Sequence, residues 1–81
     1  MSKIEKLIEK FKGIRVDFTW NELKKLLKHY GFKEIQGDGS RVKFINGNKV
    51  IINLHKPHPK NVLKRYQIKN VIEILNNENL L

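Results

Sequence analysis

The sequence contains no cysteine, which excludes disulfide bridges and thiolate-ligated metal ions. It also lacks any apolar run near the roughly 18 residues that a membrane-spanning helix needs. Residues 1–6 alternate charged and apolar side chains, so they do not form the uninterrupted apolar core of a signal peptide. These absences predict a cytoplasmic protein that does not associate with a membrane.

Acidic residues are missing from the middle of the chain. No Asp or Glu lies between residues 41 and 65, a segment that we call the basic window. The window contains seven basic residues, Arg41, Lys43, Lys49, Lys56, Lys60, Lys64 and Arg65, in a chain of net charge +9. A segment of one charge sign repels itself unless a polyanion lies against it, and a phosphate backbone is the commonest such partner. The basic window therefore predicts a nucleic-acid-binding surface.

The chain has 81 residues, 40% of them hydrophobic and 31% charged, which predicts one small folded domain over residues 1–81. Ser2 and Glu5 form a capping-box pattern before an extra N-terminal helix, expected within residues 1–13. Thr19 and Glu22 repeat the pattern before a second apolar stripe at helical spacing, which stops at Gly31. This second helix is the first element of the main part of the domain, which we expect over residues 19–77.

From residue 32 onward the apolar period changes to two, which predicts three short strands over residues 32–36, 41–45 and 49–54. The turn signals are the segment 37–40 and the pair Asn46-Gly47. Pro57 and Pro59 then hold His58 in an extended loop, and an amphipathic helix follows from Arg65. The predicted fold class is α+β, in the order α-α-β-β-β-α, with helices packed on one face of a three-stranded antiparallel sheet.

His55 and His58 are the candidate catalytic residues of the basic window. No third ligand of suitable type lies near them, so we expect no metal site and no cofactor. An imidazole accepts a proton near neutral pH, and metal-free RNA cleavage needs such a base for the 2′-hydroxyl. It also needs cations for the phosphorane charge and an acid for the leaving oxygen. A structural role, in which the histidines contact phosphates or end a strand, stays open.

Arg41 and Lys43 are expected on one face of their strand, where they suit contact with a nucleic-acid backbone. An ordinary solvated hairpin is the alternative interpretation. Trp20 and Tyr30 lie on an apolar helical stripe and are expected in the core, whereas Tyr66 at the start of the last helix is left unassigned.

Several short motifs follow one another along the chain: Thr19-Trp-Asn-Glu-Leu-Lys-Lys-Leu-Leu, Gly31-Phe, Gly39-Ser, Lys43-Phe and Ile52-Asn-Leu-His-Lys-Pro-His-Pro. In this arrangement the chain resembles the HicA-type toxins of bacterial and archaeal toxin–antitoxin pairs, over about residues 19–75. The resemblance implies a fold similar to the double-stranded RNA-binding domain and a metal-independent endoribonuclease activity on mRNA. It also implies a HicB-type antitoxin that covers the active surface.

One position departs from the family's pattern. The family carries its catalytic histidine directly after Gly-Ser, and this chain has Arg41 there. Arginine stays protonated and cannot serve as a base. Either catalysis relies on His55 or His58, or the protein binds RNA without cleaving it.

The leading hypothesis is a HicA-type toxin in which His55 is the base and His58 the candidate acid. Arg41 and Lys43 then stabilise phosphate charge, and the other basic residues of the window position the RNA backbone. A non-catalytic nucleic-acid-binding module on the same fold is the first alternative. A DNA-binding winged helix is the second, although a third strand and a closing helix do not suit it.

Overall fold

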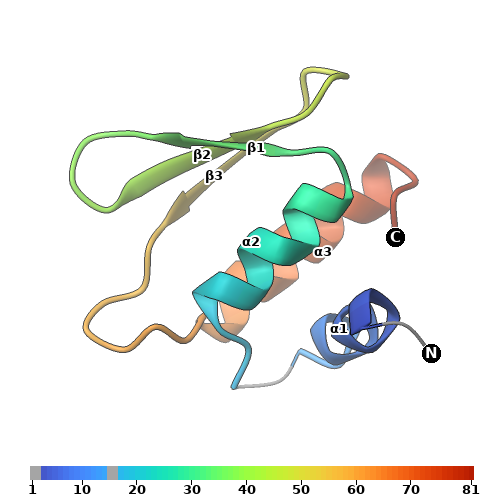
Figure 1. The fold of residues 1–81 in the computed structure, drawn as a ribbon, viewed down its shortest axis with the longest axis horizontal. Helices are drawn as coiled ribbons and strands as arrows, with labels where there is room; N and C mark the ends of the chain where they lie inside the picture. The colour runs from blue at the N-terminus through green and yellow to red at the C-terminus, as the bar shows by residue number, and fades with distance from the viewer. Residues whose placement is uncertain (1–2, 15–16) are drawn as a thin grey trace.

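The computed structural model describes residues 3–14 and 17–81. Its helices are α1 (Lys3–Lys12), α2 (Trp20–His29) and α3 (Arg65–Asn77), and its strands are β1 (Lys33–Gln36), β2 (Arg41–Ile45) and β3 (Ile51–His55). The strands form one antiparallel sheet in the order β1-β2-β3. This arrangement confirms the predicted α+β fold and its order of elements (Figure 1). The predicted cap at Ser2 lies outside the described residues.

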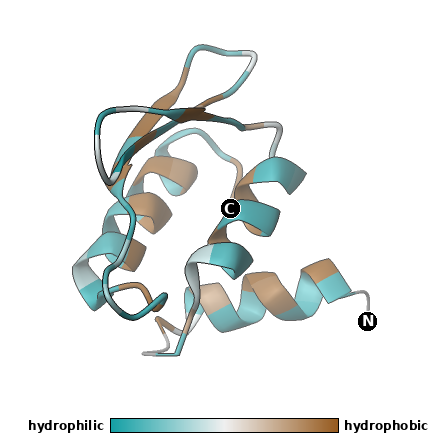
Figure 2. Ribbon diagram, turned by 60° about the vertical axis from the view of Figure 1, so that its left-hand side comes forward, coloured by the Kyte–Doolittle hydropathy of each residue, from teal (hydrophilic) through white to brown (hydrophobic). Residues whose placement is uncertain are grey.

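The sheet lies over α2 and α3, and α1 lies on the far side of these two helices (Figures 1 and 2). The apolar stripes of α2 and α3 supply Leu23, Leu26, Leu27, Ile68, Val71 and Leu75 to the core, all fully buried. One face of the sheet and the segments around it add Phe18, Phe32, Val42, Phe44, Ile52, Leu54 and Leu63. No helix among the described residues is long and apolar enough to cross a membrane.

Helix α1 packs against this core through Ile4, Leu7 and Ile8, and its last turn enters the core. Phe11 is fully buried, and its ring centroid lies 5.0 Å from that of Phe18. On the same side, Lys10 Nζ lies 3.0 Å from a carboxylate oxygen of Glu22 in the first turn of α2. An aromatic contact and an ion pair therefore attach the N-terminal helix to the start of α2.

Local signals account for both ends of α2. The Thr19 side chain accepts from the Glu22 N–H, and the Glu22 carboxylate accepts from the Thr19 N–H at 2.9 Å, which confirms the predicted capping box. At the other end Gly31 has a φ of 85°, and the Phe32 N–H donates to the Leu27 carbonyl. This is a Schellman motif, in which the left-handed residue is a glycine because it has no Cβ.

Basic and apolar residues alternate along β2, and their side chains lie on the faces that the sequence predicts. Val42 and Phe44 are 3% and 2% exposed, whereas Arg41 and Lys43 are exposed on the opposite face. Successive side chains of a strand point to opposite faces, so burial of the apolar pair forces the basic pair into solvent.

The β2–β3 hairpin is confirmed, but its turn is wider than the predicted closure at Asn46-Gly47. Ile45 pairs with Ile51, which leaves residues 46–50 in the loop and starts the third strand two residues later than expected. The Asn46 side chain accepts from the backbone N–H groups of Asn48 and Val50, at 3.0 and 2.9 Å. Lys49 takes the left-handed conformation, with a φ of 63°. The Lys49 N–H also donates to the Asn46 carbonyl at 3.1 Å and the Asn46 N–H to the Val50 carbonyl at 3.2 Å, so the chain reverses in a β-turn over residues 46–49 that the asparagine side chain braces.

Glu22 should make the stability of the fold depend on pH. Burial raises the pKa of Glu22, but the hydrogen bonds from the Thr19 backbone and from Lys10 outweigh burial, so its pKa lies below the ordinary 4.5. A carboxylate with a lowered folded-state pKa stabilises the fold fully above its unfolded-state pKa. This contribution is lost as the pH falls through the folded-state value.

We expect Glu22→Gln to lower the free energy of unfolding by about 1 kcal/mol at neutral pH, since it removes the ion pair and weakens the cap. The difference from the wild type should shrink as the pH falls below the ordinary value of 4.5. Urea unfolding at a series of pH values measures both effects. Glu73→Gln, at an exposed position of α3, is the matched control. A difference that does not change with pH would contradict the assignment.

Candidate nucleic-acid interface

The face of the sheet that is turned away from the helices carries charged and polar side chains beside two exposed isoleucines, Ile35 and Ile51. Arg41 and Lys43 of β2 lie on it together with Asn53 and His55 of β3, and all four side chains are exposed. The register pairs Arg41 with His55 and Lys43 with Asn53. The pattern that buries the core therefore also assembles cations and an imidazole on one surface, which we call the open face.

Arg41 and His55 stand directly opposite each other on adjacent strands. The Lys56 N–H donates to the Ser40 carbonyl at 2.7 Å, so Ser40 and Lys56 form a hydrogen-bonded pair beyond the end of the strands. Hydrogen-bonded and non-hydrogen-bonded pairs alternate along an antiparallel ladder, so the next pair, Arg41–His55, is of the non-hydrogen-bonded kind. In such pairs the side chains stand closer together, which brings a permanent cation beside an imidazole.

The hydroxyl of Ser40 lies beside the same imidazole. Ser40 Oγ is 3.4 Å from His55 Nδ1, at the long end of the hydrogen-bonding range. If Nδ1 carries the proton, it donates to the hydroxyl and Nε2 becomes the acceptor. The hydroxyl can equally donate to an unprotonated Nδ1, so the contact holds the ring in either tautomer, and Nε2 is the acceptor only when Nδ1 carries the proton.

The turn between β1 and β2 explains the Gly-Ser motif in structural terms. The Gly37 N–H donates to the Arg41 carbonyl at 2.8 Å, and a Cβ at Gly37 would lie only 3.1 Å from that oxygen. Gly39 has a φ of 61°, a conformation that glycine adopts without strain. Both glycines hold a tight turn that places Ser40 and Arg41 at the start of β2.

A groove of about 500 Å³ follows this turn across the open face. It is lined by Gly37, Asp38, Arg41, Val42, Lys43, Asn53, Leu54 and His55. Two permanent cations face a single carboxylate, that of Asp38, so the lining carries net positive charge. Such a groove suits a phosphodiester better than a neutral or cationic ligand.

A buried glutamine that sequence reasoning missed holds the end of β3. Gln67 is 5% exposed, its side-chain oxygen accepts from the Lys64 N–H at 3.0 Å, and its Nε2 donates to the His55 carbonyl at 2.9 Å. This one side chain ties the backbone of the candidate base to the start of α3. Its only sequence signal is a polar residue directly before the apolar stripe that begins at Ile68.

His58 occupies a different place from His55. It lies in the loop 56–64 and lines a second groove, of about 350 Å³, with Pro57, Pro59, Lys60, Val62 and Lys64. No residue lines both grooves. The structure brings Arg41, Lys43 and His55 together and sets His58 apart from them.

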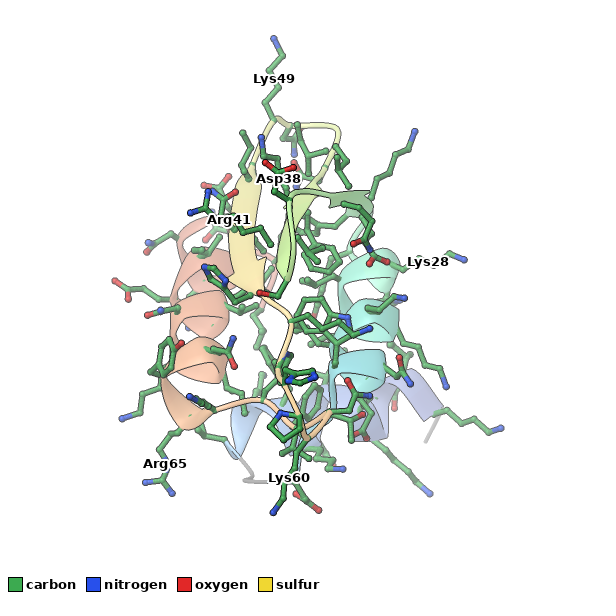
Figure 3. All side chains as sticks on the ribbon, turned by 90° about the vertical axis from the view of Figure 1, so that its left-hand side faces the viewer. Lys28, Asp38, Arg41, Lys49, Lys60 and Arg65 are labelled. Carbon is green, nitrogen blue, oxygen red and sulfur yellow. The ribbon has the colours of Figure 1, made fainter. Side chains whose placement is uncertain are left out.

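The other basic residues of the window are spread along the molecule. Figure 3 shows Lys49 at the tip of the β2–β3 loop, Arg41 at mid-height, and Lys60 and Arg65 at the opposite end. Lys56 directly follows His55, and Lys64 directly precedes α3. A ligand that touched all of these cations would have to be extended. Among residues 3–14 and 17–81, no group of three or more His, Cys, Asp or Glu side chains could hold a metal ion.

Comparison with protein families gives one match. A family model described as the HicA toxin of bacterial toxin-antitoxin matches residues 20–76. The matched segment runs from the first residue of α2 almost to the end of α3, and α1 lies outside it. No curated protein and no solved structure matches the chain significantly. The chain therefore belongs to the HicA toxin family.

Replacement of Gln67 should loosen the joint between β3 and α3. Gln67→Met keeps the approximate size of the side chain but leaves the His55 carbonyl and the Lys64 N–H without a partner. We expect the free energy of unfolding to fall by about 1–3 kcal/mol and amide exchange in the loop 56–64 to accelerate. Asn70→Met, at an exposed position on the same helix, should do neither. Equal effects of the two substitutions would contradict the role of Gln67.

Proposed function

We propose that this member of the HicA family is an RNA-directed toxin that cleaves mRNA without a metal ion, in the cytoplasm. The observation that carries the proposal is the cross-strand pair Arg41–His55 in a groove of net positive charge. The pair supplies a fixed cation for a phosphate and, beside it, a group that accepts a proton near neutral pH.

The chemistry that this pair supports is an attack of the RNA on its own backbone. His55 Nε2 takes the proton of a ribose 2′-hydroxyl, and the resulting oxygen nucleophile attacks the adjacent phosphorus. The bond from phosphorus to the 5′-oxygen breaks, and an acid protonates that oxygen, which leaves a 2′,3′-cyclic phosphate and a 5′-hydroxyl. Arg41 and Lys43 stabilise the charge on the pentavalent intermediate. His58, the acid expected from the sequence, lines a separate groove of the loop 56–64, so we assign the protonation of the leaving oxygen to a water molecule at the open face.

The remaining cations of the basic window suit contact with the RNA backbone on either side of the groove. Lys56, Lys60, Lys64 and Arg65 follow β3 toward α3, and Lys49 lies at the other end of the hairpin. All five side chains are exposed. Their spread along the molecule supports several phosphate contacts with one extended strand.

A HicB-type antitoxin is the protein partner that we propose for the open face. Besides its cations, this face exposes Ile35, which pairs with Lys43, and Ile51, which pairs with Ile45. Exposed isoleucines beside cations suit an acidic protein with an apolar patch better than they suit nucleic acid alone. A partner seated there would cover Arg41 and His55 together.

A non-catalytic RNA-binding module is the second candidate function. The observation in its favour is Arg41, which stands where the family carries its catalytic histidine and cannot act as a base. The two functions predict the same surface and differ only in the role of His55.

Removal of the imidazole separates the two candidates. His55→Ala should lower metal-free RNA cleavage by about 10²–10⁴-fold, the usual contribution of a general base. RNA affinity should stay within a few fold, because the phosphate contacts remain. Cleavage assays with a chelator present, and growth arrest on expression, measure the effect. His29→Ala, on the exposed side of α2, is the control. Unchanged cleavage in His55→Ala would show that another group is the base.

The converse substitution, Arg41→His, restores an imidazole at the family's position. We expect it to raise the cleavage rate if the rest of the site is competent. If the wild type cleaves no RNA and Arg41→His is equally inert, the enzyme proposal is wrong and the binding module stands.

RNA binding itself should depend steeply on salt. Each single-strand phosphate that is contacted contributes about 0.7 log units of affinity per log unit of salt concentration. Lys43→Gln should reduce this slope by about one such contact, and Lys12→Gln on α1 should not. Fluorescence anisotropy over a salt series measures the slope. No binding at low salt would overturn both candidate functions.

A further inference from the structure

Among the described residues, Tyr66 is the one Phe, Tyr or Trp whose ring is exposed. It is the second residue of α3 and is 58% exposed, whereas Phe11, Phe18, Trp20, Phe32 and Phe44 are at most 4% exposed and Tyr30 is half-buried. Its hydroxyl has no hydrogen-bond partner among the described residues, and Ile68, Val71 and Leu75 form the core-facing side of the helix. The ring therefore contributes little to the packing of the fold.

The surroundings of Tyr66 are strongly basic. Lys64 and Arg65 directly precede it, Lys69 follows one turn later, and all three side chains are exposed. The first turn of α3 contains no acidic residue. A polyanion drawn to these cations would pass directly beside the ring.

Aromatic rings beside cations have a recurrent use in RNA recognition. A base stacks on the ring while its phosphate contacts the cations, and each such stack is worth several-fold to more than a hundred-fold in affinity. A ring at the protein surface can accept only a base that has left its own stack, because both faces of a base inside a duplex are already covered. A ring at this position therefore distinguishes unpaired from paired RNA.

We propose that Tyr66 is a stacking platform for one unpaired base of the RNA, so that the substrate is single-stranded where it crosses the start of α3. This inference rests on the proposed RNA-directed function and extends it to a class of substrate. The platform carries no base preference of its own, since every base has a face that can stack.

The test compares Tyr66→Ala and Tyr66→Phe on two probes, a labelled 2′-O-methyl oligouridine and a long duplex of 2′-O-methyl RNA, in which internal base pairs far outnumber the two end pairs that have an uncovered face. Neither probe can be cleaved, because its 2′-oxygen carries no proton. We expect Tyr66→Ala to weaken binding to oligouridine by roughly 5- to 150-fold and binding to the duplex by less than about two-fold. Tyr66→Phe keeps the ring and should bind like the wild type, and Tyr66→Leu, apolar but not aromatic, should behave like the alanine variant.

The salt dependence of binding gives a second readout. Loss of a stacked base removes no phosphate contact, so Tyr66→Ala should keep the wild-type slope of log affinity against log salt concentration. Arg65→Ala removes a phosphate contact and should lower this slope by about 0.7. Equal losses on both probes, or oligouridine binding by Tyr66→Ala within two-fold of the wild type, would overturn the platform while leaving RNA binding intact. Wild-type protein that binds neither probe at low salt would overturn the proposed function instead.

Discussion

The register between β2 and β3 is the constraint on which the rest of the molecule depends. Because Val42 and Phe44 must face the helices, Arg41 and Lys43 must face solvent, and the pairing then sets His55 opposite Arg41. A slip of one residue would bury two cations and expose two core side chains, at a cost that a domain of this size could not sustain. The stability of the core therefore enforces the arrangement of the open face, and no separate device is needed to assemble it.

Two further contacts join the elements of the fold, one at the sheet and one between the first two helices. Gln67 joins the backbone of His55 to the start of α3, and the ion pair of Lys10 with Glu22 joins α1 to the cap of α2. Both are hydrogen-bonded polar contacts at least partly removed from solvent. Removal of one partner therefore leaves the other without a hydrogen bond and lowers the stability of the fold. Helix α1 lies outside the segment that matches the family, yet its ion pair reaches the first turn of the matched segment. The added helix thus stabilises the family core without covering the open face.

The parts of the fold that could be predicted from the sequence are those with local causes. The capping box at Thr19, the glycine stop at Gly31 and the alternation along β2 each act within a few residues, and the structure confirms all three. The exact length of the β2–β3 turn could not be predicted, because it depends on two hydrogen bonds to the Asn46 side chain and a left-handed Lys49. The role of Gln67 was equally hidden, since its partner carbonyl belongs to a residue 12 positions away. Contacts across such separations appear only once the elements are packed.

The exchange of histidine for arginine after the Gly-Ser motif has a consistent physical interpretation. In a non-hydrogen-bonded antiparallel pair the two side chains reach nearly the same space from adjacent strands. An imidazole on β3 and a guanidinium on β2 can therefore serve one bound phosphate as well as the reverse arrangement, provided that the pairing is kept. In the function that we propose, the pairing across the ladder, more than the choice of the strand that carries the imidazole, is thus what positions the base.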